Sequence, residues 1–181
     1  MQRRKEEEAG EEKEMTGKTH AICGTMTAVA VAACNAKGIQ FGDYMLIPWI
    51  SVIAAPTGSY MPDIDLHRSK MGSKHKIISK LLTHRGITHT LLVPVILAVL
   101  QWFLMDKGVI VLPDLIFGFN IGWVVHIIAD MFNKKGVPLL WPLTNAHLHV
   151  ATILTSTWQE GLFIAFWAVV NLGACWYIFT H

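Results

Sequence analysis

The chain has 181 residues, of which 52% are hydrophobic and only 15% are charged, and seven of them are tryptophans. A single soluble domain of this size could hardly keep so much apolar surface out of water, so the composition indicates a membrane protein. Cys23, Cys34 and Cys175 lie in apolar runs without C-x-x-C spacing, and we interpret them as small buried residues rather than a disulfide framework or zinc site. No recognisable nucleic-acid-binding module carries the basic residues, so we expect no nucleic-acid partner.

The first 18 residues combine six Glu with five Lys or Arg and contain no aromatic residue. Such a segment cannot bury enough apolar surface to offset the entropy lost on ordering. We therefore predict a disordered charged tail over 1–18, followed by one membrane-embedded hydrolase domain over 19–181.

Five apolar segments follow the tail, with lengths near the roughly 17–25 residues that cross a bilayer core. Backbone in hydrocarbon must satisfy its own hydrogen bonds, which excludes open strands. The sequence therefore predicts an all-α fold, a polytopic membrane helix bundle with about five transmembrane helices. The expected spans are 21–36, 44–61, 87–105, 109–132 and 162–179.

Alternating spans place the tail and the segments 62–86 and 133–161 on one side of the membrane. Of the 15 Lys and Arg residues, 13 then lie on this side, and Lys37 and Lys107 lie on the other. By the positive-inside rule the first side is cytoplasmic. We expect a multi-pass protein of the inner, cytoplasmic membrane.

The same alternation gathers metal-type ligands at the cytoplasmic ends of the spans. Eight of the nine histidines fall on this side, and only His181 does not. If these histidines and aspartates had no shared function, we would expect them at both ends of the spans. The seven expected ligands are His20, Asp63, Asp65, His84, His89, His126 and Asp130.

Each ligand pair also has a simpler interpretation. His126 and Asp130 are four residues apart, so they project from one helical face and could chelate an ion or only form a helix-end hydrogen bond. Asp63 and Asp65 follow Pro62, and they could serve as a ligand and a base or merely end a helix in a Pro-Asp turn.

The compact stretch from His84 to His89 is the most specific of these motifs. It reads His-Arg-Gly-Ile-Thr-His, and Arg85 is a permanent cation available to a phosphate. His20 taken alone fits an interfacial histidine better than a ligand. Candidates of second rank for a metal site are His67, His147 and His149.

Together these motifs resemble the YdjM-like family of membrane-bound, predicted metal-dependent hydrolases. The resemblance rests on Lys18-Thr19-His20, Pro62–Asp65, His84–His89, and His126 to Asp130 followed by Leu140-Trp141-Pro142. It implies metal ligation by His20, Asp63 or Asp65, His84, His89, His126 and Asp130, and a distant similarity to the all-helical zinc-dependent phospholipase C. Those phospholipases also use a Glu ligand on a His-x-x-x-Glu helix, whereas Glu160 is the only Glu of this chain outside the tail.

Two loops have membrane-surface interpretations. In 66–86, basic residues alternate with Ile77, Ile78, Leu81 and Leu82, which predicts a short amphipathic helix in the headgroup layer. That helix could anchor the chain to anionic lipid or guide phosphoesters to the ligands. The segment 136–158, rich in Trp and Pro, is interpreted as an interfacial lid.

The leading hypothesis is a membrane-bound hydrolase that acts on a small phosphoester or a lipid. Imidazoles and carboxylates suit Zn²⁺ or Mn²⁺, and the number of histidines favours zinc. We expect Asp65 or Asp63 to accept a proton and Arg85 to hold the phosphate. The alternative is a metal carrier or sensor, although a carrier would need ligands near the bilayer midplane.

Overall fold

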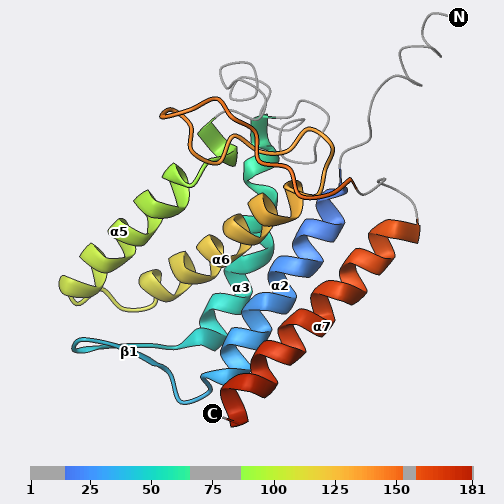
Figure 1. The fold of residues 1–181 in the computed structure, drawn as a ribbon. Helices are drawn as coiled ribbons and strands as arrows, with labels where there is room; N and C mark the ends of the chain where they lie inside the picture. The colour runs from blue at the N-terminus through green and yellow to red at the C-terminus, as the bar shows by residue number, and fades with distance from the viewer. Residues whose placement is uncertain (1–14, 66–86, 153–157, 181) are drawn as a thin grey trace, which may run out of the picture.

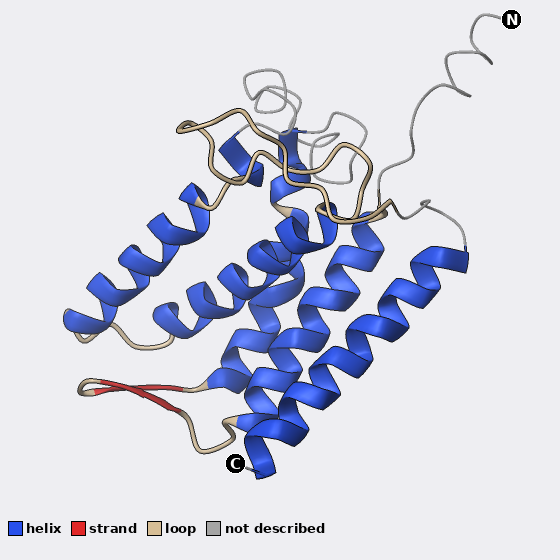
Figure 2. Cartoon of the chain, in the orientation of Figure 1, coloured by secondary structure: helices blue, strands red, loops and turns tan. Residues whose placement is uncertain are grey.

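The computed structural model describes residues 15–65, 87–152 and 158–180, with the side chains of residues 64 and 65 excepted (Figure 1). Most of these residues are helical, as Figure 2 shows. The five described α-helices are α2 (Gly17–Cys34), α3 (Pro48–Tyr60), α5 (Leu92–Asp106), α6 (Leu112–Asp130) and α7 (Trp158–Thr180).

The helices run alternately in opposite directions along the bundle (Figure 1). Consequently α2, α5 and α7 begin at the end of the bundle where α3 and α6 finish. Helices α2, α3 and α6 pack against one another, while α5 packs on α6 and α7 packs chiefly on α2. This alternation of direction brings distant segments of the chain to one end of the bundle.

Only two of the described helices, α6 and α7, are long and apolar enough to cross a membrane by length and composition. They contain 19 and 23 residues, whereas α3 has 13 and α5 has 15. Five helices occur near the five expected spans, but α3 and α5 are shorter than predicted. The membrane-length stretch of α6 is 50% buried and that of α7 only 6%, so α6 is central and α7 peripheral.

Helices α3 and α6 approach so closely that backbone meets backbone. A Cβ atom added at Gly58 of α3 would overlap the carbonyl of Phe119, and one at Gly118 of α6 would overlap that of Ser51. Small residues permit this approach, as is common between helices in membranes. The contact fixes α3 against the first half of α6, about two turns before His126.

Gly58→Ala is expected to lower the thermal unfolding midpoint, because overpacking of this kind costs about 1–3 kcal/mol. Gly173→Ala in α7 is the matched control, since its added Cβ would meet nothing within 4 Å. On helix propensity alone either change would stabilise by up to about 1 kcal/mol. Thermal unfolding of both variants in detergent checks the contrast, and equal midpoints would contradict it.

The all-α prediction is wrong between the first two helices, where a two-stranded antiparallel sheet lies. Strands β1 (Ile39–Phe41) and β2 (Tyr44–Leu46) pair with Phe41 opposite Tyr44. The two-residue loop begins with Gly42 at φ 57°, a conformation that glycine adopts without steric cost. The second expected span therefore loses its first residues to a hairpin.

The folded part of the chain begins before the expected end of the tail. Met15 is buried, and Thr16 caps α2 by accepting a hydrogen bond from the Thr19 amide. Helix α2 then starts at Gly17, four residues before the expected span. Residues 15–18 thus belong to the domain, and the tail prediction for 1–14 falls outside the described residues.

Candidate metal centre

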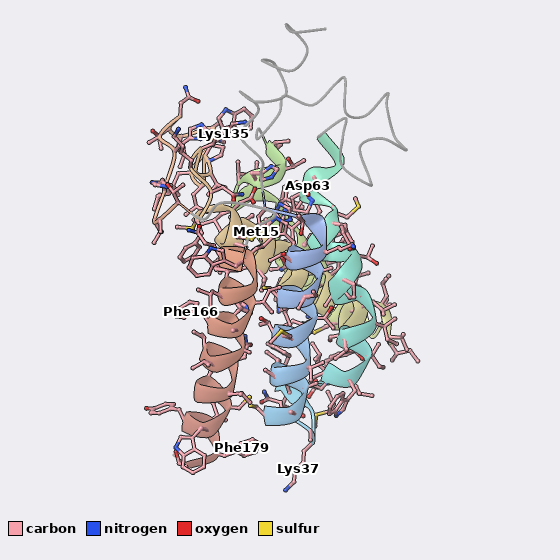
Figure 3. All side chains as sticks on the ribbon, turned by 90° about the vertical axis from the view of Figure 1, so that its right-hand side faces the viewer. Met15, Lys37, Asp63, Lys135, Phe166 and Phe179 are labelled. Carbon is pink, nitrogen blue, oxygen red and sulfur yellow. The ribbon has the colours of Figure 1, made fainter. Side chains whose placement is uncertain are left out.

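Five histidine and aspartate side chains converge at the end of the bundle where α2 begins and α6 ends. They come from α2, α6 and two short 3-10 helices, η1 (Pro62–Asp65) and η2 (Ile87–His89). Figure 3 shows Asp63 and Met15 at this end and Lys37 at the opposite one. The five residues are His20, Asp63, His89, His126 and Asp130.

The carboxylate of Asp130 lies at the middle of the cluster. Its Oδ1 is 3.3 Å from Nε2 of His20, and its Oδ2 is 3.4 Å from Nε2 of His89 and 3.7 Å from Nε2 of His126. The ring of His20 stacks on that of His126 with centroids 3.9 Å apart. Three imidazoles therefore point the same nitrogen at one region.

The protonation of His126 follows from its hydrogen bond. Its Nδ1 is 2.8 Å from the carbonyl oxygen of Ser59, which only accepts, so Nδ1 carries the proton. In the neutral ring Nε2 then carries a lone pair, and it lies 3.4 Å from Nε2 of His89, 3.6 Å from Asp63 Oδ1 and 3.7 Å from Asp130 Oδ2. A lone pair and a carboxylate oxygen that face one another repel unless a proton or a metal cation lies between them.

Burial makes this arrangement costly without a cation. The side chains of His20 and His89 are 1% exposed, that of His126 is 0% and that of Asp130 is 4%. A charge buried to this extent is tolerated only where it is paired, hydrogen-bonded or bound to a metal. Asp63 is the most exposed of the five, at 15%, so it marks the side from which the cluster can be reached.

Neighbouring groups hold two of these side chains in place. The amide of Asn133 donates to Asp130 Oδ1 at 2.6 Å, and the hydroxyl of Thr88 is 3.0 Å from Nδ1 of His89. The indole of Trp123 donates to the carbonyl of Thr88 at 2.9 Å. Such outer partners orient ligands and fix their tautomers.

Sequence reasoning missed two contributions to this end of the bundle. Glu160 of α7 is buried and accepts a hydrogen bond of 2.6 Å from the backbone amide of Thr16, one turn before His20. The Ser59 carbonyl is a main-chain group, so no residue type signals it. For Glu160, the only signal in the sequence was a single acidic residue at the start of an apolar helix.

The structure brings together five of the seven predicted ligands. The side chain of Asp65 and the whole of His84 and Arg85 lie outside the described residues, as do His67 and the amphipathic helix expected in 66–86. His147 and His149 are exposed and contact the Lys135 carbonyl and the Thr152 hydroxyl. These two histidines are not among the five converging side chains.

The predicted lid over 136–158 is described as far as residue 152. Val137 and Leu148 exchange two backbone hydrogen bonds, and the carbonyl of Leu139 accepts from the Leu91 amide at the start of α5. The loop therefore connects the end of α6 to α5 at the same end of the bundle as the candidate metal centre.

The fold and the cluster define a class: a helical bundle, apolar enough in α6 and α7 to enter a membrane, with a buried histidine–aspartate site at one end. The chain belongs to the YdjM inner membrane protein family, whose model matches residues 15–181.

The chain is similar to two named proteins. It is 36% identical to inner membrane protein YdjM of Escherichia coli (strain K12) over 135 residues, which are 71% of this chain and 66% of that protein. The chain thus spans about two thirds of that relative's length. It is also 29% identical to YvsG of Bacillus subtilis (strain 168) over 170 residues, which are 91% of this chain and 95% of YvsG. No solved structure matches the chain.

Proposed function

We propose that this protein is a membrane-bound, metal-dependent hydrolase of phosphoesters whose metal is held by His20, Asp63, His89, His126 and Asp130. The observation that carries the proposal is the lone pair of His126 Nε2 facing two carboxylates within 3.6–3.7 Å in a buried site. These same nitrogen and oxygen atoms would be the ligands of a divalent cation bound there.

The donor set fits a divalent transition metal. Two carboxylates carry two negative charges, which one divalent ion neutralises. Three imidazole nitrogens with carboxylate oxygens are ligands typical of Zn²⁺, and Mn²⁺ is the alternative. The ligand atoms in each of two overlapping sets, His20–Asp63–His126 and His89–His126–Asp130, lie within 4.8 Å of one another.

The chain's own groups divide the work of hydrolysis. When bound, the metal supplies Lewis acidity and lowers the pKa of a bound water to about 7. Asp65, two residues after the ligand Asp63, is the candidate base that accepts a proton from an attacking water, and Asp63 at the open edge is its alternative. Arg85 supplies a permanent positive charge for the substrate phosphate. Asp130 holds His20 and His89 in one orientation.

We further propose that the protein is a multi-pass protein of the inner membrane with the metal centre facing the cytoplasm. The family and the E. coli relative are named as inner membrane proteins. The apolar α6 and α7, together with three shorter helices, supply about five crossings. The 13 basic residues assigned to the side of the metal centre support its cytoplasmic orientation.

Cysteine labelling checks this orientation. Lys135→Cys and Lys37→Cys, both at exposed positions, are placed in a background whose natural cysteines are serine. In right-side-out membrane vesicles, an impermeant maleimide is expected to label position 37 at once and position 135 only after detergent is added. Labelling of position 135 from outside would reverse the assignment.

A metal carrier or sensor is the alternative function. It would use the same ligands without hydrolysis, and a carrier would also need access from both sides near the midplane. The five converging side chains all lie at one end of the bundle, which supports the hydrolase.

Metal analysis and turnover decide between the two. Purified protein is reconstituted with Zn²⁺ or Mn²⁺, and phosphate release is measured from p-nitrophenyl phosphate, phosphatidic acid and other phosphoesters. We expect bound metal and turnover, and we expect Asp63→Asn to lower the turnover. Bound metal without release from any phosphoester would favour the carrier or sensor, and protein that binds no metal would overturn both.

A further inference from the structure

Two of the three cysteines lie beside each other in space, although they are far apart in the chain. Cys34 is the last residue of α2, and Cys175 lies in the last two turns of α7. The Sγ of Cys175 is 3.5 Å from the carbonyl oxygen of Ala30, which is one helical turn before Cys34. In an α-helix that carbonyl accepts from the amide four residues on, which is that of Cys34, so the Cys175 thiol lies beside the last turn of α2.

This pair differs from the third cysteine in exposure and place. Cys23 is 0% exposed and packs with Val125 and Ala129 in the core beside the candidate metal centre. Cys34 and Cys175 are both partly exposed, so a small oxidant can reach them. They lie near the opposite end of the bundle, where Figure 3 places Lys37 and Phe179.

We propose that Cys34 and Cys175 are a disulfide-forming pair that joins α2 to α7 covalently. The thiolate of one cysteine attacks a disulfide oxidant, and the second thiolate attacks the mixed disulfide that results. One intramolecular S–S bond forms, the oxidant's S–S bond is reduced to two thiols, and the two protons of the cysteines pass to those thiols. Two electrons leave the pair and are taken up by the oxidant.

A disulfide at this position would stabilise the packing of α7 on α2. Helix α7 packs chiefly on α2, and a bond near its far end would hold the two together along their length. The same helix supplies Glu160 and Phe163 to the surroundings of His20. With the metal centre in the cytoplasm, the pair lies toward the outer side of the membrane, where disulfides form and persist.

Thiol counting on the full-length protein tests the pair without reference to metal or membrane orientation. Detergent-purified protein is incubated with oxidised glutathione, and its free thiols are counted by alkylation and mass spectrometry. We expect three alkylated cysteines to fall to one, with a loss of two mass units and a 34–175 cross-linked peptide in monomeric protein. Cys23→Ser is the matched control and is expected to form the same bond.

Variants that lack one cysteine of the pair provide the second test of the proposed disulfide. Cys34→Ser and Cys175→Ser each leave one cysteine of the pair, so neither variant is expected to form an intramolecular bond. The wild-type peptide map stands on its own should either variant fail to fold. Three free thiols after oxidation, bonds only between molecules, or a bond that includes Cys23 would each overturn the proposal.

Discussion

His126→Ala is expected to reduce the metal affinity of the purified protein by more than about 100-fold, because loss of an outer partner alone commonly costs about 10–100-fold. His126 belongs to both sets of ligand atoms that lie within 4.8 Å of one another, so its removal opens both. Asp130→Ala is expected to have a similar effect, since its carboxylate contacts all three imidazoles. Elemental analysis after zinc reconstitution measures the loss.

His149→Ala is the matched control for this prediction. It removes an imidazole from the same end of the bundle, but one that is exposed and contacts the Thr152 hydroxyl. We expect metal occupancy to stay at the wild-type level. Full occupancy in His126→Ala, or a loss in His149→Ala equal to that in His126→Ala, would place the metal elsewhere.

Removal of the metal is expected to lower the thermal unfolding midpoint of the wild-type protein strongly. A ligand that binds only the folded state stabilises it by about 4 kcal/mol at a thousand times its dissociation constant. Chelation would also remove a positive charge from between the buried Asp130 carboxylate and His126 Nε2, which lie 3.7 Å apart. Thermal unfolding in detergent, with and without a chelator, measures the shift.

The control for chelation is the variant that lacks the site. In His126→Ala the chelator has little metal to remove, so the midpoints with and without it should coincide. A shift of equal size in the wild-type protein and the variant would mean that the chelator acts elsewhere. An unchanged wild-type midpoint after complete metal removal would show that the ion does not contribute to stability.

The sequence predicts the helices better than their ends. Apolar runs of near-membrane length mark all five described helices, because burial in protein and burial in lipid select the same residue types. For the same reason such runs could not show that α3 would stop at 13 residues. Gly42-Asp43, which lies between two short apolar stretches, is a sequence typical of a hairpin turn. We instead assigned the residues after it to the second expected span, because they continue into a long apolar run.

Much of the candidate metal centre could also be predicted, because alternation fixes which ends of the helices meet. His20 is uninformative alone and gains meaning only beside Asp130, more than 100 residues away. Contacts between segments so distant in the chain depend on packing. The close approach of Gly58 to Phe119 helps to position α3 against α6, but a glycine in the sequence does not show which helix it will contact. For the same reason the hydrogen bond between Glu160 and the Thr16 amide was visible only in the structure.

The hydrogen bond from His126 to Ser59 has a consequence for genetics. Because the acceptor is a main-chain oxygen, every amino acid at position 59 still presents it, and no single replacement can delete it. The Ser59 side chain is 0% exposed and would overlap a Cβ placed at Gly24. A deep mutational scan would therefore score this position by side-chain volume, tolerating alanine and rejecting larger residues. The tautomer of His126 would then depend on a backbone carbonyl whose position is set by the packing of residue 59. A search for polar side chains essential to function would not detect this hydrogen bond.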